Sequence, residues 1–149
     1  MIDMGFVMAG HAIFTVGNDK GNHYTFRVSC PKNNPDLHFI GLLTGPDNGA
    51  DYTYMGILLP DGAVRLTKAS KYTGDSTPVR VASWACKVIL GKAALPAGYS
   101  IQHAGRCGRC GRLLTTPESI ERGIGPECWD IMHGGAAVEA PKVEELIGF

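Results

Sequence analysis

Three of the five cysteines in this chain lie close together near its C-terminal end, and this cluster constrains the fold most. Cys107 and Cys110 form a C-x-x-C pair, and Cys128 follows after a spacer of 17 residues. Secreted proteins with disulfide frameworks usually carry an even set of cysteines spread along the chain, whereas this set is odd and clustered. Two thiolates on one tight turn, with a third further along, are typical of a tetrahedral zinc site. The sequence therefore predicts a small zinc-binding knuckle over residues 103–133, with Zn²⁺ as cofactor.

The spacer between the cysteine pair and Cys128 predicts two short helices. Thr116 and Pro117 are a typical N-cap and first helical position, and Gly123 can end that helix. The Gly125–Pro126 pair can begin a second helix, with Cys128 in its first turn. The positive end of a helix stabilises a thiolate, so this position suits a metal ligand.

Three thiolates leave one ligand position to fill. His103, four residues before Cys107, is the first candidate, and a full set of four protein ligands would make the site structural. His133 is the competing histidine, and Asp130 or water are further alternatives. Thiol–disulfide chemistry and zinc-dependent deamination also use C-x-x-C pairs. The first favours a helix start in a βαβ unit and the second needs an H-x-E element, and neither context is present.

The region before the knuckle predicts an α+β fold. Apolar and β-branched segments alternate with turn-forming residues such as Asp61-Gly62, which favours a five-stranded, mostly antiparallel sheet. Residues 78–92 carry apolar side chains at helical spacing, with Thr77 as a suitable N-cap and Pro78 at the first helical position, which predicts one helix packed on the sheet. The expected strands cover 12–16, 23–29, 37–45, 51–59 and 63–70, and the short segment 99–103 is expected as a strand leading to the knuckle.

The expected organisation is thus a sheet domain over 1–102, the knuckle over 103–133 and a flexible C-terminal tail over 134–149. The tail is rich in Gly, Ala and Pro and lacks a periodic apolar face. Cys30 and Cys86 lie within apolar segments and are expected to be packing residues. With no signal peptide and no apolar run long enough to span a membrane, we expect a protein of the host-cell cytoplasm.

The formal net charge is zero, but the charges are segregated along the chain. Residues 62–112 hold nine Lys and Arg residues against the single Asp75, whereas the segments on either side are acidic. A basic centre of this kind favours binding to a polyanion, although the same residues can also pair with acidic groups in the fold.

The knuckle sequence HAGRCGRCGRLLTTPESIERGIGPEC (103–128) resembles a family of unknown function that is frequent in bacteriophages and mobile elements. The shared signature is H-x-G-R-C-G-R-C-G-R, then L-T, then P-E-S-I-x-x-G-I-G-P-x-C. Because this pattern includes the histidine, the resemblance supports His103 as the fourth ligand. It also implies a phage or prophage origin, and leaves the biochemical activity open.

Two functions are consistent with these features, and neither is catalytic. The first is a phage-encoded zinc-binding accessory protein that binds nucleic acid or a nucleic-acid-processing complex. The second is a protein-binding inhibitor of a host nuclease or defence effector, similar in role to an anti-CRISPR protein. No phosphate-binding loop, nucleophile elbow or carboxylate cluster indicates an enzyme, and no small-molecule substrate is expected. The candidate residues for contacting nucleic acid or a partner are Arg65, Lys68, Lys71, Tyr72, Arg106, Arg109 and Arg112.

Overall fold

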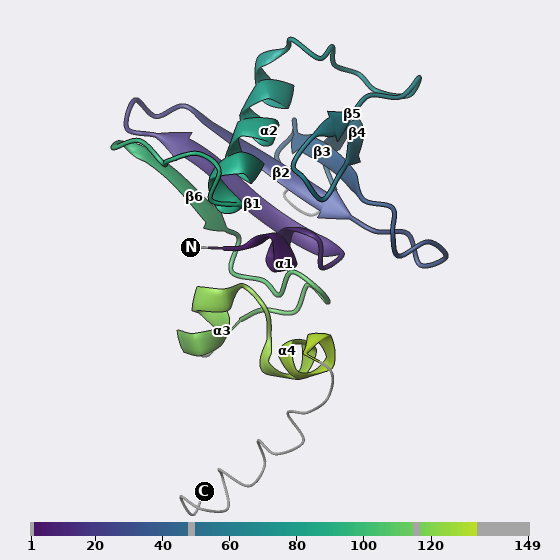
Figure 1. The fold of residues 1–149 in the computed structure, drawn as a ribbon, viewed down its shortest axis with the longest axis vertical. Coiled ribbons are helices and arrows are strands. Elements are labelled where there is room, and N and C mark those ends of the chain that lie inside the picture. Colours follow the sequence, from purple (N-terminus) through teal and green to yellow (C-terminus); the bar gives the residue numbers. More distant parts are fainter. Residues whose placement is uncertain (1, 48–49, 115–116, 134–149) are drawn as a thin grey trace, which may run out of the picture.

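A computed structural model describes residues 2–47, 50–114 and 117–133, and its fold is α+β (Figure 1). The strands are β1 (His11–Asn18), β2 (His23–Ser29), β3 (Phe39–Leu43), β4 (Tyr52–Leu58), β5 (Val64–Arg65) and β6 (Tyr99–His103). The helices are α1 (Met4–Val7), α2 (Thr77–Ile89), α3 (Pro117–Arg122) and α4 (Pro126–Met132). None of these helices is long and apolar enough to cross a membrane.

All six strands form one curled antiparallel sheet in the order β5-β4-β3-β2-β1-β6. The first five strands follow one another as a meander, which confirms the antiparallel sheet expected from the turn-forming residues. The segment 99–103 does more than connect to the knuckle, because it pairs along β1 from Asn18 to Phe14. The sheet therefore has six strands rather than five.

One face of the sheet is covered by α2, which lies across β1 and β2 in Figure 1. The core includes the alternating side chains of Phe14, Phe26 and Ile40 from the sheet, with Ala82 and Cys86 from α2. All five are fully buried. The predicted helix is thus confirmed with Pro78 in its first turn, but its N-cap is Ser76 and not Thr77, which is its first residue.

The opposite face of the sheet, which we call the open face, carries half-buried side chains. Register pairs Arg27 with Gly41, Gly41 with Tyr54, and Leu43 with Tyr52, and side chains at paired positions share a face. Phe39 joins this set through its pairing with Ile57. The open face is therefore a surface of aromatic and basic residues.

The strand expected over 63–70 is much shorter in the structure. Only Val64 and Arg65 pair with β4, after which the Thr67 amide donates to the Ser70 hydroxyl oxygen at 2.8 Å. The Ser70 amide in turn donates to the Thr67 carbonyl at 3.0 Å. These two hydrogen bonds stabilise a turn and compete with strand pairing, so the sequence-based strand was too long.

Helix α1 was not expected from the sequence, and it positions the knuckle. Asp3 caps it by accepting a hydrogen bond from the Phe6 amide at 2.9 Å, and the Phe6 ring is fully buried. That ring contacts both Gly108 and Gly123, where an added Cβ would lie 2.6 Å and 2.5 Å from it. The knuckle therefore packs on the N-terminal helix, at the end of the sheet where Figure 1 places α3 and α4. The division into domains at residue 102 remains a prediction, and the tail proposed for 134–149 lies outside the described residues.

Candidate metal centre

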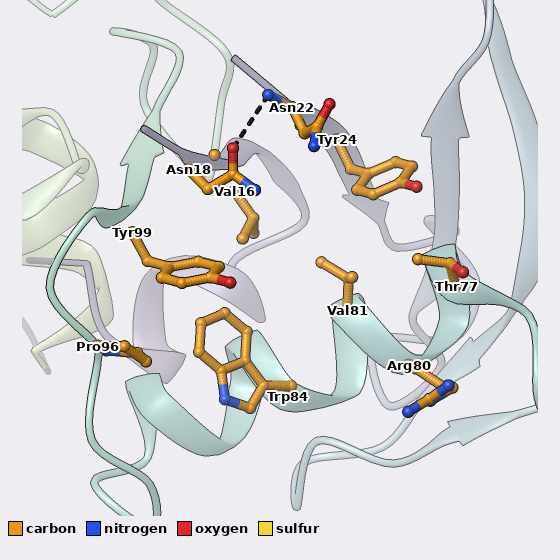
Figure 2. Close-up of a pocket in the computed structure, with 11 residues that line it drawn as sticks. Val16, Asn18, Asn22, Tyr24, Thr77, Arg80, Val81, Trp84, Pro96 and Tyr99 are labelled. Atoms are coloured by element: carbon orange, nitrogen blue, oxygen red, sulfur yellow. Dashed lines mark hydrogen bonds between the residues drawn. The ribbon is translucent and has the colours of Figure 1, made fainter. Parts of the chain in front are cut away.

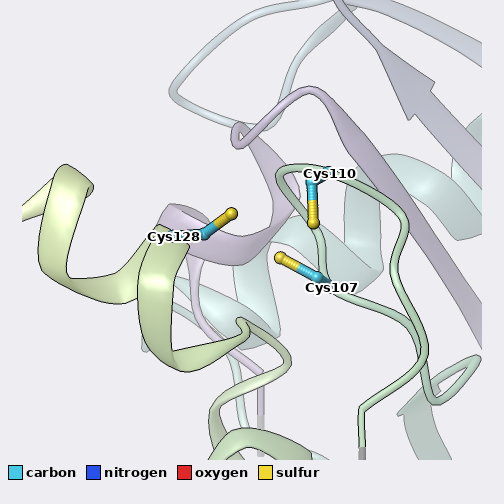
Figure 3. A group of neighbouring side chains, drawn as sticks. All are labelled: Cys107, Cys110 and Cys128. Atoms are coloured by element: carbon cyan, nitrogen blue, oxygen red, sulfur yellow. The ribbon is translucent and has the colours of Figure 1, made fainter.

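The side chains of Cys107, Cys110 and Cys128 meet at one point of the knuckle. Their sulfur atoms all lie within 4.8 Å of one another, and Figure 3 shows them directed toward a common centre. A tetrahedral zinc ion with Zn–S bonds of about 2.3 Å needs sulfurs about 3.8 Å apart, so this spacing fits such an ion. All five cysteines of the chain are free thiols, and these three form a possible metal site.

Two segments far apart in the sequence bring the sulfurs together. Cys107 and Cys110 lie on a tight turn closed by hydrogen bonds from the Gly111 amide to the Cys107 carbonyl (2.9 Å) and from the Cys107 amide to the Arg112 carbonyl (2.8 Å). Gly111 has a φ of +78°, a conformation that favours glycine. Cys128 lies in the first turn of α4, after the Gly125 N-cap and Pro126, as the sequence predicted.

The two halves are joined by a third contact. The Gly108 amide donates to the Gly123 carbonyl at 2.7 Å, while the Gly108 carbonyl accepts from the His11 amide at 2.7 Å. Residue 108 thus links the cysteine turn to both the α3–α4 connection and strand β1. This explains why a side chain is missing there, since a Cβ would also contact Phe6.

Backbone amides favour the thiolate form of Cys107. Burial of its sulfur raises the pKa, but hydrogen bonds from the backbone N–H groups of Gly125, Cys110 and Arg109 lower it by more, so the pKa of Cys107 falls to about 7. The Arg109 amide is 3.4 Å from that sulfur. A thiolate formed near neutral pH is the species that binds a metal.

The pKa of Cys128 is raised, in contrast to that of Cys107. Burial raises the pKa of its thiol, and the nearby Arg109 guanidinium, whose Nη1 donates to the sulfur at 3.5 Å, lowers it in part. Arg109 therefore contacts the sulfurs of two cysteines, once through its backbone and once through its side chain. A positive charge at this position offsets the negative charge of a three-thiolate cluster.

His103 does not join the three sulfurs in this structure. It ends β6, as expected, but its Nδ1 accepts a hydrogen bond from the Gly105 amide at 2.9 Å, and its Nε2 contacts the Ile120 carbonyl. Its ring also packs near Phe6, with centroids 5.8 Å apart. Both ring nitrogens are thus engaged with the backbone, and His103 links the end of the sheet to α3.

The alternative ligands are also placed elsewhere. His133 stacks on Trp129, with ring centroids 3.9 Å apart, and its Nδ1 lies 2.8 Å from the Trp129 carbonyl oxygen. Among the described residues, the group of possible metal ligands contains the three cysteines and neither His133 nor Asp130. The fourth ligand is therefore unassigned by the described side chains.

The knuckle arginines are exposed or half-exposed, and each has a local contact. Arg106 donates to the Gly111 carbonyl at 3.3 Å, and Arg112 lies 3.7 Å from Glu127 across a highly exposed ion pair. Exposed pairs of this kind contribute little to stability, so Arg112 remains accessible to a ligand.

The other predicted contact residues lie at the β5 edge of the sheet, opposite the β6 edge that leads into the knuckle. Arg65, Lys68 and Lys71 are exposed on β5 and the turn after it, whereas Tyr72 is half-buried and packs against the core. Leu113 and Ile131, which the sequence did not single out, lie beside the cysteines and are 60% and 58% exposed. Their only sequence signal is an apolar residue next to a proposed ligand turn.

Comparison with known proteins adds one finding. Residues 100–133 match a family of unknown function (DUF6011). The matched DUF6011 segment begins at the second residue of β6 and covers the whole knuckle but fewer than half of the 149 residues. The segment that carries the knuckle is therefore similar to a family without an assigned function. No curated protein and no solved structure matches the chain.

Proposed function

We propose that this chain is a phage-encoded, non-catalytic accessory protein that binds single-stranded nucleic acid, with a zinc ion holding the knuckle together. The metal is assigned as zinc because three cysteine thiolates on a turn and a helix start suit a soft, tetrahedral ion. Its place of action would be the cytoplasm of a bacterial host.

The observation that carries this proposal is the arrangement of cations beside the aromatic open face. The Lys71 amide donates to the Tyr54 carbonyl at 3.3 Å, and the Tyr54 hydroxyl contacts the Thr67 hydroxyl at 3.1 Å. The exposed turn that carries Lys68 and Lys71 therefore borders Tyr54.

The aromatic part of this surface is a shallow hollow of about 410 Å³ on the open face. Phe39 and Tyr54 meet edge to face at 5.9 Å, and the Arg27 guanidinium lies 4.5 Å above the Tyr52 ring. Aromatic rings next to cations are the features on which proteins stack bases and hold phosphates of a single strand.

A salt-titrated binding measurement tests the proposal. Anisotropy of labelled single- and double-stranded DNA and RNA would be followed with the zinc-loaded full chain, and we expect affinity to fall steeply with salt. The triple variant R65Q/K68Q/K71Q should bind at least tenfold more weakly and reduce the slope of log K against log salt by about 2, at about 0.7 per phosphate contact.

A matched control removes the same number of charges elsewhere. Lys20, Lys32 and Lys92 are exposed on other loops, and K20Q/K32Q/K92Q should leave the slope nearly unchanged. Equal losses in both triple variants would point to general charge rather than to this surface. Absence of binding to every nucleic acid at low salt would refute the proposal.

A second candidate function, inhibition of a host nuclease or defence effector, is favoured by a different observation. Leu113 and Ile131 expose apolar surface in the hollow that the three cysteines also line, and apolar side chains that gather at one exposed site mark contacts with other proteins. Capture of one stoichiometric host protein, lost in L113S/I131S but kept in L66S, would support it. Leu66 is the control because it is also exposed, at 39%, but lies after β5.

A further inference from the structure

A cavity of about 560 Å³ lies between α2 and the end of the sheet where β1, β2 and β6 meet (Figure 2). It is on the face of the sheet that α2 covers, away from both the open face and the cysteines. Small-molecule sites in proteins usually enclose 300–1,000 Å³ and combine apolar walls with a few polar groups. This cavity has both properties.

Aromatic rings from three elements form its walls. Trp84 of α2 and Tyr99 of β6 meet edge to face with centroids 5.6 Å apart, and Tyr24 of β2 lies across the cavity from them. Tyr99 is 44% exposed. Because the two rings meet at 66°, a planar ring can stack on the exposed face of Tyr99 while Trp84 forms the apolar wall beside it.

The rim of the cavity presents an oriented carboxamide. The Asn18 side-chain oxygen accepts hydrogen bonds from the amides of Lys20 and Asn22, at 3.0 and 3.1 Å. These bonds fix the side chain and leave its NH₂ group for another acceptor, since no hydrogen bond within the described residues uses it. A carboxamide held in this way can pair with the edge of a heterocyclic base.

The cavity also contains a positive charge, which comes from Arg80. It is the one charged residue that lines the cavity, and it makes no ion pair within the part of the chain that the structure describes. Its nearest interacting acid is Asp75, which is fully exposed and bonds to the Thr73 hydroxyl. A planar guanidinium at the mouth of an aromatic cavity is complementary to a phosphate group.

We propose that this cavity binds one nucleotide unit, with the base stacked on Tyr99 and bordered by Trp84, its edge near Asn18, and its phosphate at Arg80. The same unit can come as a free mononucleotide or as one residue of a single strand. In the first case the inference is independent of the nucleic-acid function proposed above, and in the second it adds a base-binding position to that function.

Isothermal titration calorimetry with the zinc-loaded full chain tests this assignment. The probes are the four ribonucleoside monophosphates, the matching nucleosides and a short single-stranded oligonucleotide. We expect Y99A to weaken binding of nucleoside and nucleotide alike, at least tenfold, because both lose the stacking surface. R80Q should weaken the monophosphate about tenfold and leave the nucleoside unchanged, because only the phosphate contact is removed.

Lys87→Gln is the matched control for Arg80→Gln. Lys87 is exposed on the same helix but does not line this cavity, so its loss should leave every affinity unchanged. Equal unfolding temperatures for the three variants and the parent protein would show that the fold is intact. Binding of the oligonucleotide alone, weakened by Y99A and R80Q, would assign the unit to a strand.

Two outcomes would overturn the inference. One is the absence of binding by every probe at millimolar concentration. The other is binding that Y99A and R80Q leave unchanged. If R65Q/K68Q/K71Q weakens an oligonucleotide while the cavity variants do not, the nucleic-acid function stands and the cavity assignment fails.

Discussion

The three cysteines of the metal centre differ in exposure although their sulfurs converge. Cys107 and Cys128 are buried at 0% and 6% exposure, whereas Cys110 is exposed at the tip of its turn. A metal ion would therefore be held by two fixed ligands and one that reaches it from the surface. Removing the exposed ligand perturbs packing least.

Cys110→Ser should reduce zinc affinity at least 100-fold while leaving the sheet folded, because an alcohol does not replace a thiolate ligand at neutral pH. Competition with a chromogenic chelator measures the affinity. Cys30→Ser is the control, since Cys30 is half-buried and is not in the group of possible metal ligands among the described residues, so this variant should bind zinc as the parent does. Unchanged affinity in C110S would show that this thiol is not a ligand.

His103→Gln distinguishes a ligand from a structural link. Because both ring nitrogens contact backbone groups of the knuckle, we expect zinc affinity to change less than tenfold and stability to fall by about 1 kcal/mol for the lost hydrogen bonds. Cobalt substitution provides the readout, since the visible spectrum reports the ligand set. A large affinity loss with a changed cobalt spectrum would restore the histidine as fourth ligand.

Cys86 predicts a pH dependence of stability. Burial against the core raises the pKa of its thiol to about 11, so the folded state holds this proton more tightly than the unfolded state. The resulting stabilisation is complete below about pH 9, the ordinary thiol value, and is lost as pH rises toward 11. Denaturant unfolding of zinc-loaded protein should therefore weaken more steeply over this window in the parent than in C86A. Parallel curves would contradict the buried neutral thiol.

At the scale of elements, local signals predicted most of the structure. The Asp61-Gly62 turn, the helix after Thr77 and the Gly125–Pro126 helix start each depend on neighbouring residues, and each is present. The pairing of β6 with β1 joins residues more than eighty positions apart, and no local pattern encodes it. The predicted length of β5 was wrong because the Ser70 hydroxyl accepts a hydrogen bond from the Thr67 amide, which competes with strand pairing.

The candidate site shows the same division. The C-x-x-C spacing and the helix start at Cys128 predicted the cysteine cluster, because the geometry of each is set by residues adjacent in the sequence. The placement of His103 depends on α1, which supplies Phe6, and on the Ile120 carbonyl of α3. The surroundings of that histidine come from two distant segments, so sequence spacing alone could not predict its neighbours.

Gly123→Ala tests the packing of α1 on the knuckle. Gly123 has a φ of +75°, and an added Cβ would lie 2.5 Å from the buried Phe6 ring, which has no room to move. Gly111 has a similar φ of +78° with nothing within 4 Å, so Gly111→Ala carries the backbone strain alone. We expect G123A to lower the free energy of unfolding by about 1–3 kcal/mol more than G111A. Equal losses in denaturant titrations would show that the ring contact is unimportant.

At the scale of the whole molecule, the metal centre and the sheet share one core. Cys107 and Ile124 of the knuckle belong to the same buried cluster as Phe6, Phe14 and Phe26. The His11 amide of β1 donates directly to the Gly108 carbonyl. A change at the cysteines should therefore alter the stability of the sheet.

Removing the metal should lower the unfolding temperature of the entire described chain in a single transition. The loss follows from linkage, since an ion that binds only the folded state stabilises it by about 2.7 kcal/mol at a hundredfold excess over Kd. Calorimetry with and without a chelator measures the shift, and amide exchange at His11 should accelerate on chelation. Two separate transitions, only one of them metal-dependent, would show that knuckle and sheet unfold independently.

The contact of Phe6 with Gly108 and Gly123 also governs when the chain can fold. A ribosome releases residue 6 long before residue 123, so the aromatic ring has no partner for most of synthesis. Strands β1 to β5 can pair as each emerges, because the meander joins neighbours. The outer strand β6 can pair with β1 only after residue 103 has been made, and the docking of the first helix must wait for Gly123. Contacts of such high sequence separation slow folding, and they make completion of this core a late step.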